Sequence, residues 1–364
     1  MLEFFPSRTL TLYLARLFLT RILAVLLMLV LVLQVLDLLG ASGDILAYSG
    51  NGQEQLLYYV SLRIPQLIAR FLPYSVLLAT IITLATLNQN SEVVSMKAAG
   101  LSAHQVLAPL ILTAFVISIF SFAFNERVVT RATASLDAWS AVEYGPVPKD
   151  SGVRNNLYLS DGRDLLLART LAGQGDRMVL SGVTFYRRDQ NDMVVEQLRA
   201  ERAVYANPGW KLERPVRFVV AGTQTTRLAS ATVAPGITPG EVMLARVDAD
   251  SQDLFSLAGS IGELHEAGRR TSSLDAAWWH KISGPLSSTL MPLLGAVAAF
   301  GLARSGQLLV RAVIGMALGF AYFVFDNAAL AMGNFGGYPP LVAAWAPFVL
   351  FALIGETVLV RTEE

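Results

Sequence analysis

Long runs without charge are the feature that most limits how this chain can fold. Six stretches of about 20 mostly apolar residues lie between charged residues. The bilayer core offers no water to backbone amides, so such runs cross it as helices. The expected spans cover residues 17–39, 71–88, 101–124 and 282–303, and two more lie between 311 and 361 around a Gly/Pro-rich hairpin at 333–340.

The charged residues gather in one segment. They make up only 15% of the chain, against about 25% in a typical soluble protein. Of the 56 present, 33 lie between residues 141 and 275. This segment alternates polar and apolar residues, as half-buried antiparallel strands do. Strands are expected at 156–160, 164–169, 178–188, 193–206 and 211–220, with turns at 161–162 and 207–209.

The predicted fold class is an α-helical membrane protein with six transmembrane helices and an inserted all-β, jellyroll-like domain of about eight to ten strands. The first three helices occupy residues 1–134, the β domain 135–270, and the last three helices 271–364. No cleavable signal peptide is expected, because the first apolar run is too long for a typical signal core and five further spans follow it.

The loop charges predict an orientation. Six spans place both termini on one side, and the β domain, which interrupts spans three and four, on the other. Seven basic residues flank the span ends on the terminal side and five flank the opposite ends. Because Lys and Arg collect on the cytoplasmic side, both termini are expected in the cytoplasm and the β domain outside it.

Several function classes are disfavoured. The net charge is zero, which argues against a nucleic-acid partner. None of the four lysines is followed by Ser or Thr, so the chain lacks a P-loop for ATP. It has no cysteine, and His104, His265 and His280 do not form a metal-ligand spacing. We therefore expect no catalytic residue, metal or cofactor, and a membrane protein that is not an enzyme.

The segment between spans two and three is the most informative. Ser91 can cap a short helix, and Glu92 is well placed at its positive end. Gly100 can end the helix in the left-handed conformation, and Ser102 with Gln105 fits a capping box that opens span three. A short helix across the membrane face suits docking into a cytoplasmic motor. An ordinary amphipathic connector is the alternative.

A few polar or small residues occur within the spans. Asp326 and Glu356 lie in or at the end of apolar runs, where each charge should face protein or water. Gly315 and Gly319 form a small-xxx-small pair that permits close helix approach, either within the chain or to a partner.

With these motifs the chain resembles the LptF/LptG family, the permeases of the lipopolysaccharide exporter, over nearly its whole length. Three patches carry the resemblance: Phe71-Leu-Pro-Tyr with the segment 91–102, the hairpin at 200–212 with its Trp-Lys-Leu, and the glycines and prolines of 315–319, 333–340 and 344–347. The C-terminal patch favours the LptG branch.

The resemblance implies the following partners. An LptF-like permease would pair with this chain on a cytoplasmic, LptB-like ABC ATPase dimer in the bacterial inner membrane. Lipopolysaccharide would leave that membrane through spans one and five and pass to the periplasmic jellyroll. A single-span, LptC-like jellyroll protein and a periplasmic bridge would receive it. Glu92, with Ser91, Val94 and Lys97, would face the ATPase.

One departure from the family concerns the lipid headgroup. Family members often carry lysines near the outer end of span one, whereas this sequence has Gln34 and Asp37 there. Arg127 and Arg131, four residues apart after span three, could share a helix face and take that role, or could be interfacial anchors. The candidate lipid-contacting residues are Arg127, Arg131, Gln34, Asp37, Gly315, Gly319 and Asp326; Arg63 and Arg70 are rivals.

Three other functions are open on sequence alone. One is a permease for another lipid or for lipoprotein; permeases for lipoprotein release have fewer spans, and a β domain between spans three and four argues against them. An intramembrane enzyme would need a convergent His, Asp, Ser or metal constellation. A non-energised scaffold for a periplasmic assembly would bind no ATPase.

Overall fold

The computed structural model describes residues 5–141, 143–146, 154–172, 178–190, 193–222, 224–239, 242, 248–266, 270–300 and 308–363. The chain forms two compact units: a helical unit built from residues 1–42, 53–133 and 249–364, and a β-rich unit built from 43–52 and 134–248. Each unit is described by itself. The segment that carries the strands is inserted between long apolar helices, as the sequence predicts.

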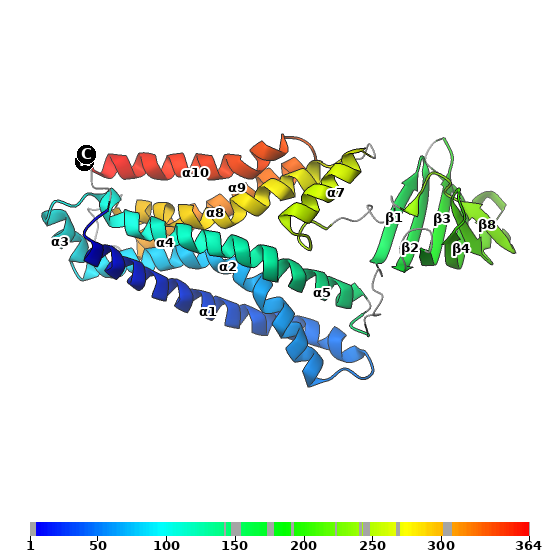
Figure 1. The fold of residues 1–364 in the computed structure, drawn as a ribbon, viewed down its shortest axis with the longest axis horizontal. Coiled ribbons are helices and arrows are strands. Elements are labelled where there is room, and N and C mark those ends of the chain that lie inside the picture. The colour runs from blue at the N-terminus through cyan, green and yellow to red at the C-terminus, as the bar shows by residue number, and fades with distance from the viewer. Residues whose placement is uncertain are drawn as a thin grey trace. The chain divides into compact units, whose positions relative to one another are not determined.

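Long helices make up the helical unit (Figure 1). Their bounds are α1 (Arg8–Ala47), α2 (Gln53–Gln89), α3 (Glu92–Ala98), α4 (Ala103–Phe124), α7 (Leu254–Glu266), α8 (Ser272–Phe300), α9 (Leu308–Asn334) and α10 (Pro340–Glu363). A π-helical segment η1 (Asn125–Val129) carries α4 into α5 (Thr130–Ala141). Both α1, with 40 residues, and α2, with 37, extend well beyond the apolar runs that predicted them.

Five helices among the described residues are long and apolar enough to cross a membrane. They are Arg8–Ala47, Gln53–Gln89, Ala103–Ser140, Val313–Asn334 and Pro340–Arg361. The fourth expected span corresponds to α8, and its last predicted residues, 301–303, lie outside the described part of the chain. Helix α8 carries Pro285 and Pro292 and several buried serines.

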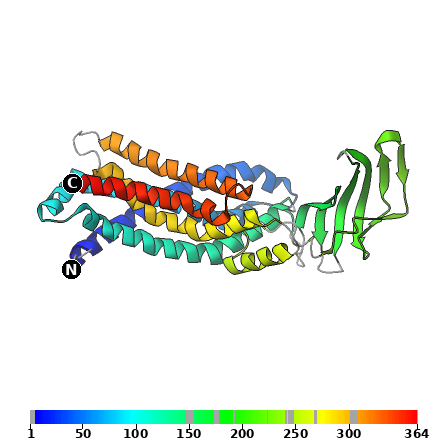
Figure 2. The same cartoon turned by 90° about the horizontal axis from the view of Figure 1, so that it is seen from above.

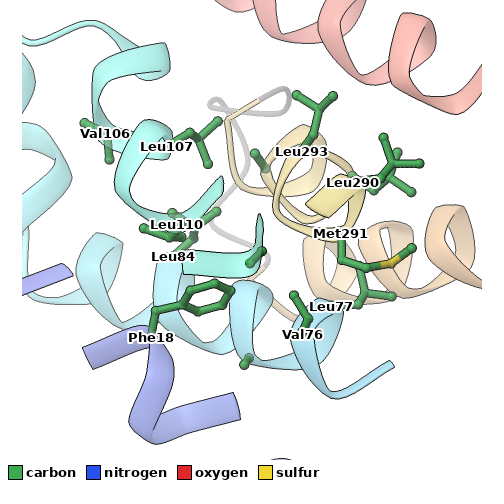
Figure 3. Close-up of a cluster of buried hydrophobic side chains, with 14 of the residues drawn as sticks. Phe18, Val76, Leu77, Leu84, Val106, Leu107, Leu110, Leu290, Met291 and Leu293 are labelled. Atoms are coloured by element: carbon green, nitrogen blue, oxygen red, sulfur yellow. The ribbon is translucent and has the colours of Figure 1, made fainter. Parts of the chain in front are cut away.

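The core of the helical unit lies around α8, which packs against α2, α4, α9 and α10. Figure 3 shows its centre: Phe18 from α1, Leu77 and Leu84 from α2, Leu107 and Leu110 from α4, and Met291 from α8 point toward one another. Burying each such side chain stabilises the bundle by about 1.5–3 kcal/mol where water is the alternative; against lipid, close packing matters more. Helix α3 and both chain ends lie at one end of this unit (Figure 2).

The strands of the β-rich unit form one antiparallel sheet. They are β1 (Arg154–Asp161), β2 (Asp164–Ala172), β3 (Val179–Arg188), β4 (Val194–Tyr205), β5 (Trp210–Glu213), β6 (Val216–Val219), β7 (Gln224–Arg227) and β8 (Ser230–Val233). The order is β1-β2-β3-β4-β5-β8, and β6 pairs with β4 and β7. Alternate residues of β4, among them Leu198 and Ala200, enter a core around the fully buried Trp210.

The expected single strand at 211–220 is divided in two. Arg214 has a positive φ of 48°, and Pro215 has no N–H to donate. The ladder therefore breaks between β5, which pairs with Arg202–Tyr205 of β4, and β6, which pairs with Glu196–Arg199. The predicted turns occur as expected: Gly162 and Gly209 both have positive φ, and Asn207–Pro208 is a cis peptide.

Candidate functional site

Two well-formed motifs follow helix α3 and separate it from α4. At its end, Gly100 adopts a φ of +88°; its N–H donates to Lys97 O, and the Leu101 N–H donates to Met96 O. This is a Schellman motif. Next, the Ser102 hydroxyl accepts from the Gln105 N–H at 3.1 Å, and Gln105 Oε1 accepts from the Ser102 N–H at 3.0 Å. The predicted glycine stop and capping box are confirmed, and together they hold α3 as a separate short helix.

The start of α3 differs from the prediction. Ser91 occupies the N-cap position, but its φ of 57° is left-handed and its side chain makes no capping hydrogen bond. The helix still begins there, because Ser91 O accepts the Ser95 N–H and hydroxyl, each at 3.0 Å. Ser91 is therefore a turn residue, and the expectation that its hydroxyl caps α3 is wrong.

Helix α3 has one buried and one exposed face. Val93 and Met96 are 4% and 8% exposed and belong to the core of the helical unit. Val94 is 64% exposed, and Ser95 and Lys97 are exposed beside it. An apolar side chain next to a cation on a firmly held helix makes a surface suited to a protein partner.

Glu92 contacts α1. Its Oε2 accepts a hydrogen bond from the Tyr13 hydroxyl at 3.0 Å, and Oε1 lies 3.4 Å from Asn90 Nδ2. The carboxylate is only partly exposed. Glu92 therefore links the first turn of α3 to α1 in addition to bordering the exposed face.

The second half of α1 carries an ion pair with α2. Arg63 donates to Asp37 through Nε, at 3.1 and 3.0 Å, and through Nη2, at 2.9 Å. The Tyr59 hydroxyl adds a bond to Asp37 Oδ2 at 2.7 Å, and Gln66 accepts from Arg63 Nη1 at 2.6 Å. Arg63 and Asp37 thus largely neutralise each other. Gln34, one turn earlier, is buried, and its amide has no hydrogen-bond partner among the described residues.

Arg127 and Arg131 are both exposed on the helix that continues α4, but a π-helical turn lies at Arg127. That turn places the neighbouring Glu126 inside the unit. Glu126 Oε2 accepts the Leu254 N–H at 2.5 Å, and Oε1 lies 3.6 Å from Lys281 Nζ. Trp278 Nε1 donates to Leu254 O at 3.1 Å. Glu126 therefore joins α4 to the start of α7 and to α8.

Asp253, the residue before Leu254, caps the start of α7. Its carboxylate accepts from the Ser256 N–H at 2.8 Å. Hydrogen bonds from Ser256 lower the pKa of Asp253 below its ordinary value, with a smaller contribution from the Lys281 cation. Asp253 stays ionised and caps α7 at neutral pH.

The other candidate lipid-contacting residues within the spans, Asp326, Gly315 and Gly319, pack inside the chain. Asp326 is 8% exposed and faces α8, where its Oδ2 lies 3.1 Å from His280 Nε2. Gly315 and Gly319 are buried, and a Cβ at Gly319 would overlap the Leu77 side chain of α2. The close approach of α9 to α2 explains why a residue without a side chain occupies position 319. Among the described residues, no group of His, Asp or Glu could hold a metal ion.

Sequence reasoning missed Tyr13, Glu126 and Lys281 as partners. Glu126 and Lys281 each flank an apolar run, where a charge needs a partner, but no sequence pattern pairs the two. Tyr13 carries no sequence signal of its own, because its role depends on where α3 folds back.

Comparisons with known proteins show the family of this chain. The profile of the family described as "Lipopolysaccharide export system permease LptF/LptG" matches residues 12–361. The lipopolysaccharide export system permease protein LptG of Escherichia coli K12 is 26% identical over 330 residues, which cover 87% of this chain and 89% of that protein. LptG of Haemophilus influenzae is 26% identical over 306 residues, or 82% and 84% of the two chains. The chain therefore belongs to the LptF/LptG family of lipopolysaccharide export permeases, membrane subunits whose transporter hydrolyses ATP on a separate subunit.

Proposed function

We propose that this chain is the LptG-type permease of its exporter. Both named relatives are LptG proteins, and the chain has no P-loop lysine of its own. In this proposal it pairs with an LptF-like permease, sits on an LptB-like ATPase dimer, and extracts lipopolysaccharide or a related glycolipid. An LptC-like protein and a periplasmic bridge receive the lipid.

The proposed topology has six spans, with α8 as the one beyond the five apolar helices. Helix α8 packs against α2, α4, α9 and α10, so its serines and prolines are enclosed by protein, where a bilayer tolerates them. Both termini and α3 lie in the cytoplasm of a bacterial inner membrane, and the segment 135–270 is periplasmic. The eight described strands are part of a jellyroll in this proposal.

Helix α3 is the proposed coupling helix, and its exposed face is the observation that carries the function. The two turns around it fix its direction, Val93 and Met96 anchor it, and Val94, Ser95 and Lys97 point outward. A motor that moved this helix would move a rigid part of the bundle. Glu92 and Ser91 border the same surface.

A charge reversal tests this assignment. Glu92→Arg should weaken binding of the ATPase and lower transport, because it opposes complementary charges across the interface. Lys211→Glu is a matched control, since Lys211 is an exposed cation on β5. If the Glu92→Arg transporter holds its ATPase and exports normally, α3 is an ordinary connector. If the unaltered chain never binds an ATPase, it is a scaffold.

The proposed lipid path follows exposed apolar helix faces. Leu27, Leu31 and Leu36 of α1 are about 60% exposed, and Phe320 of α9 is 66% exposed. Arg127 and Arg131 are the proposed headgroup contacts, because both are exposed while Arg63 already binds Asp37. Gln34 could offer its buried amide to a polar group that enters between helices. Asp37, Gly315, Gly319 and Asp326 act through packing and ion pairing.

Cysteine labelling tests the orientation, and the chain has no cysteine to interfere. Gln190→Cys, in the exposed β3–β4 turn, should react from the periplasm, and Ala98→Cys, on the exposed face of α3, from the cytoplasm. Gly209 is a poor choice, because a Cβ there would lie 2.6 Å from Val233 O. Labelling of both cysteines from one side would contradict the six-span topology.

A further inference from the structure

Within the helical unit, helix α1 is most deeply buried near its start. Leu14, Phe18 and Ile22 are at most 1% exposed and lie in the core of the helical unit. Beyond them, Leu23 and Leu31 are 57% and 58% exposed. On the other side of α1, Leu26 packs against the core, and Val30 and Gln34 are 6% and 7% exposed, so the middle of the helix has one buried and one exposed side.

Two polar contacts hold this first part of α1. The Tyr13 hydroxyl donates to Glu92 Oε2 of α3 at 3.0 Å. Arg21 Nη1 donates to Ile82 O of α2 at 3.0 Å. Tyr13 is 46% exposed, so its ring is not fixed by the core, and its hydroxyl makes a directional bond to a charged acceptor, a class stronger than neutral bonds.

The Asp37–Arg63 pair holds α1 a second time, about 36 Å further along the helix at 1.5 Å per residue. Between the two attachments α1 is a continuous helix with an exposed apolar side. A helix fixed at two distant points transmits a displacement of one point to the other, because its backbone hydrogen bonds resist bending within this length.

We propose that Tyr13 is a positioning residue for transport: through its bond to Glu92, it carries the displacement of α3 directly to α1. This inference rests on the proposed role of α3 as the coupling helix. In this proposal Glu92 has two roles: its carboxylate borders the ATPase surface, and it also holds α1. Without the Tyr13 hydroxyl, α3 would move α1 only through apolar packing and through α2.

The test uses the complete transporter with its ATPase and partner permease in lipid nanodiscs. Tyr13→Phe removes one hydroxyl and keeps the ring. We expect the ATPase to remain bound and active, while lipopolysaccharide released per ATP hydrolysed falls roughly 3- to 10-fold, because water around the half-exposed Tyr13 reduces the effect of the lost bond to that of an ordinary hydrogen bond. Tyr48→Phe is the matched control, because Tyr48 is 38% exposed and its hydroxyl makes no hydrogen bond among the described residues.

A distance measurement shows whether the two helices move together. Spin labels at Leu12, which is 60% exposed, and at Ala99, the exposed residue that follows α3, report the α1–α3 distance with and without nucleotide. The distance should stay constant in the parent transporter and change with nucleotide in Tyr13→Phe. If Tyr13→Phe keeps both the parent release ratio and the constant distance, the inference is wrong. If Glu92→Arg also keeps its ATPase, the proposed coupling helix fails as well, so the two failures are distinguishable.

Discussion

The buried pair between Glu126 and Lys281 allows a quantitative prediction about the helical unit. Their side chains are 13% and 8% exposed, and the carboxylate also accepts the Leu254 N–H. Lys281→Met removes the cation and keeps the length of the side chain, so a buried carboxylate loses its counter-charge. Removal of one member of a buried pair costs about 3–5 kcal/mol. The 3.6 Å separation exceeds hydrogen-bond range, so we expect a loss near the lower limit, about 3 kcal/mol.

The double variant Glu126→Gln/Lys281→Met isolates the charge. The amide oxygen of Gln can still accept from Leu254, and no charge remains buried, so the double variant should recover to within about 1 kcal/mol of the parent. For a unit of this size, 1 kcal/mol corresponds to roughly 2–4 °C in Tm. Lys281→Met should therefore unfold about 6–12 °C earlier in detergent, and the double variant within a few degrees of the parent.

Hydrogen exchange gives a local measurement, because a chain with two units need not unfold in one step. The Leu254 amide should exchange faster in Lys281→Met than in the parent, and its protection should return in the double variant. A parent-like Tm for Lys281→Met, or a double variant less stable than either single variant, would refute the reasoning that the pair is a coupled buried unit.

Three further predictions concern the spans. Gly319→Leu should destabilise the permease by about 1–3 kcal/mol and reduce export, because the leucine side chain would overlap Leu77. The control Ala317→Leu, on the exposed side of α9, should have no effect. Equal thermal unfolding of the two variants would argue against close α9–α2 packing. Asp37→Asn should lower stability by about 1–3 kcal/mol, because Arg63 loses its counter-charge, and a parent-like Tm would show that the pair contributes nothing. Replacing both Arg127 and Arg131 with Gln should weaken lipopolysaccharide binding more at low salt than at high salt, and photo-crosslinkers at both positions should capture the lipid; loss of binding without salt dependence would assign the headgroup to other residues.

Much of the fold could be predicted because it depends on local patterns. Uncharged runs predicted the long helices, alternation predicted β1 to β4, and the glycine at position 100 with the Ser102–Gln105 box predicted how α3 ends. These signals need only neighbouring residues. The division at Arg214 was missed although Pro215, which cannot donate to a strand ladder, was a signal within the run; the pairing of β5 and β6 with separate parts of β4 shows the two short strands.

The contacts of the candidate site depend on residues distant in sequence, so sequence patterns alone could not supply them. Asp37 was expected to meet lipid, and its pairing with Arg63 becomes visible only when α1 and α2 lie side by side. Glu126 enters the bundle because of a π-helical turn, which no residue pattern announced. The hydroxyl of Ser91 was expected to cap α3, but the sharp turn after α2 places Ser91 in a left-handed conformation instead.

The most direct test of this account is the capture of the ATPase at α3. A photo-crosslinker at Val94, which is 64% exposed, should join the chain to the ATP-hydrolysing subunit in membranes. A crosslinker at Phe335, 89% exposed in the turn between α9 and α10, is the control and should not capture it. Capture at Val94 alone is the predicted result. Capture at Phe335, or at neither position in an exporting transporter, would contradict the assignment of α3 as the surface through which ATP hydrolysis reaches this permease.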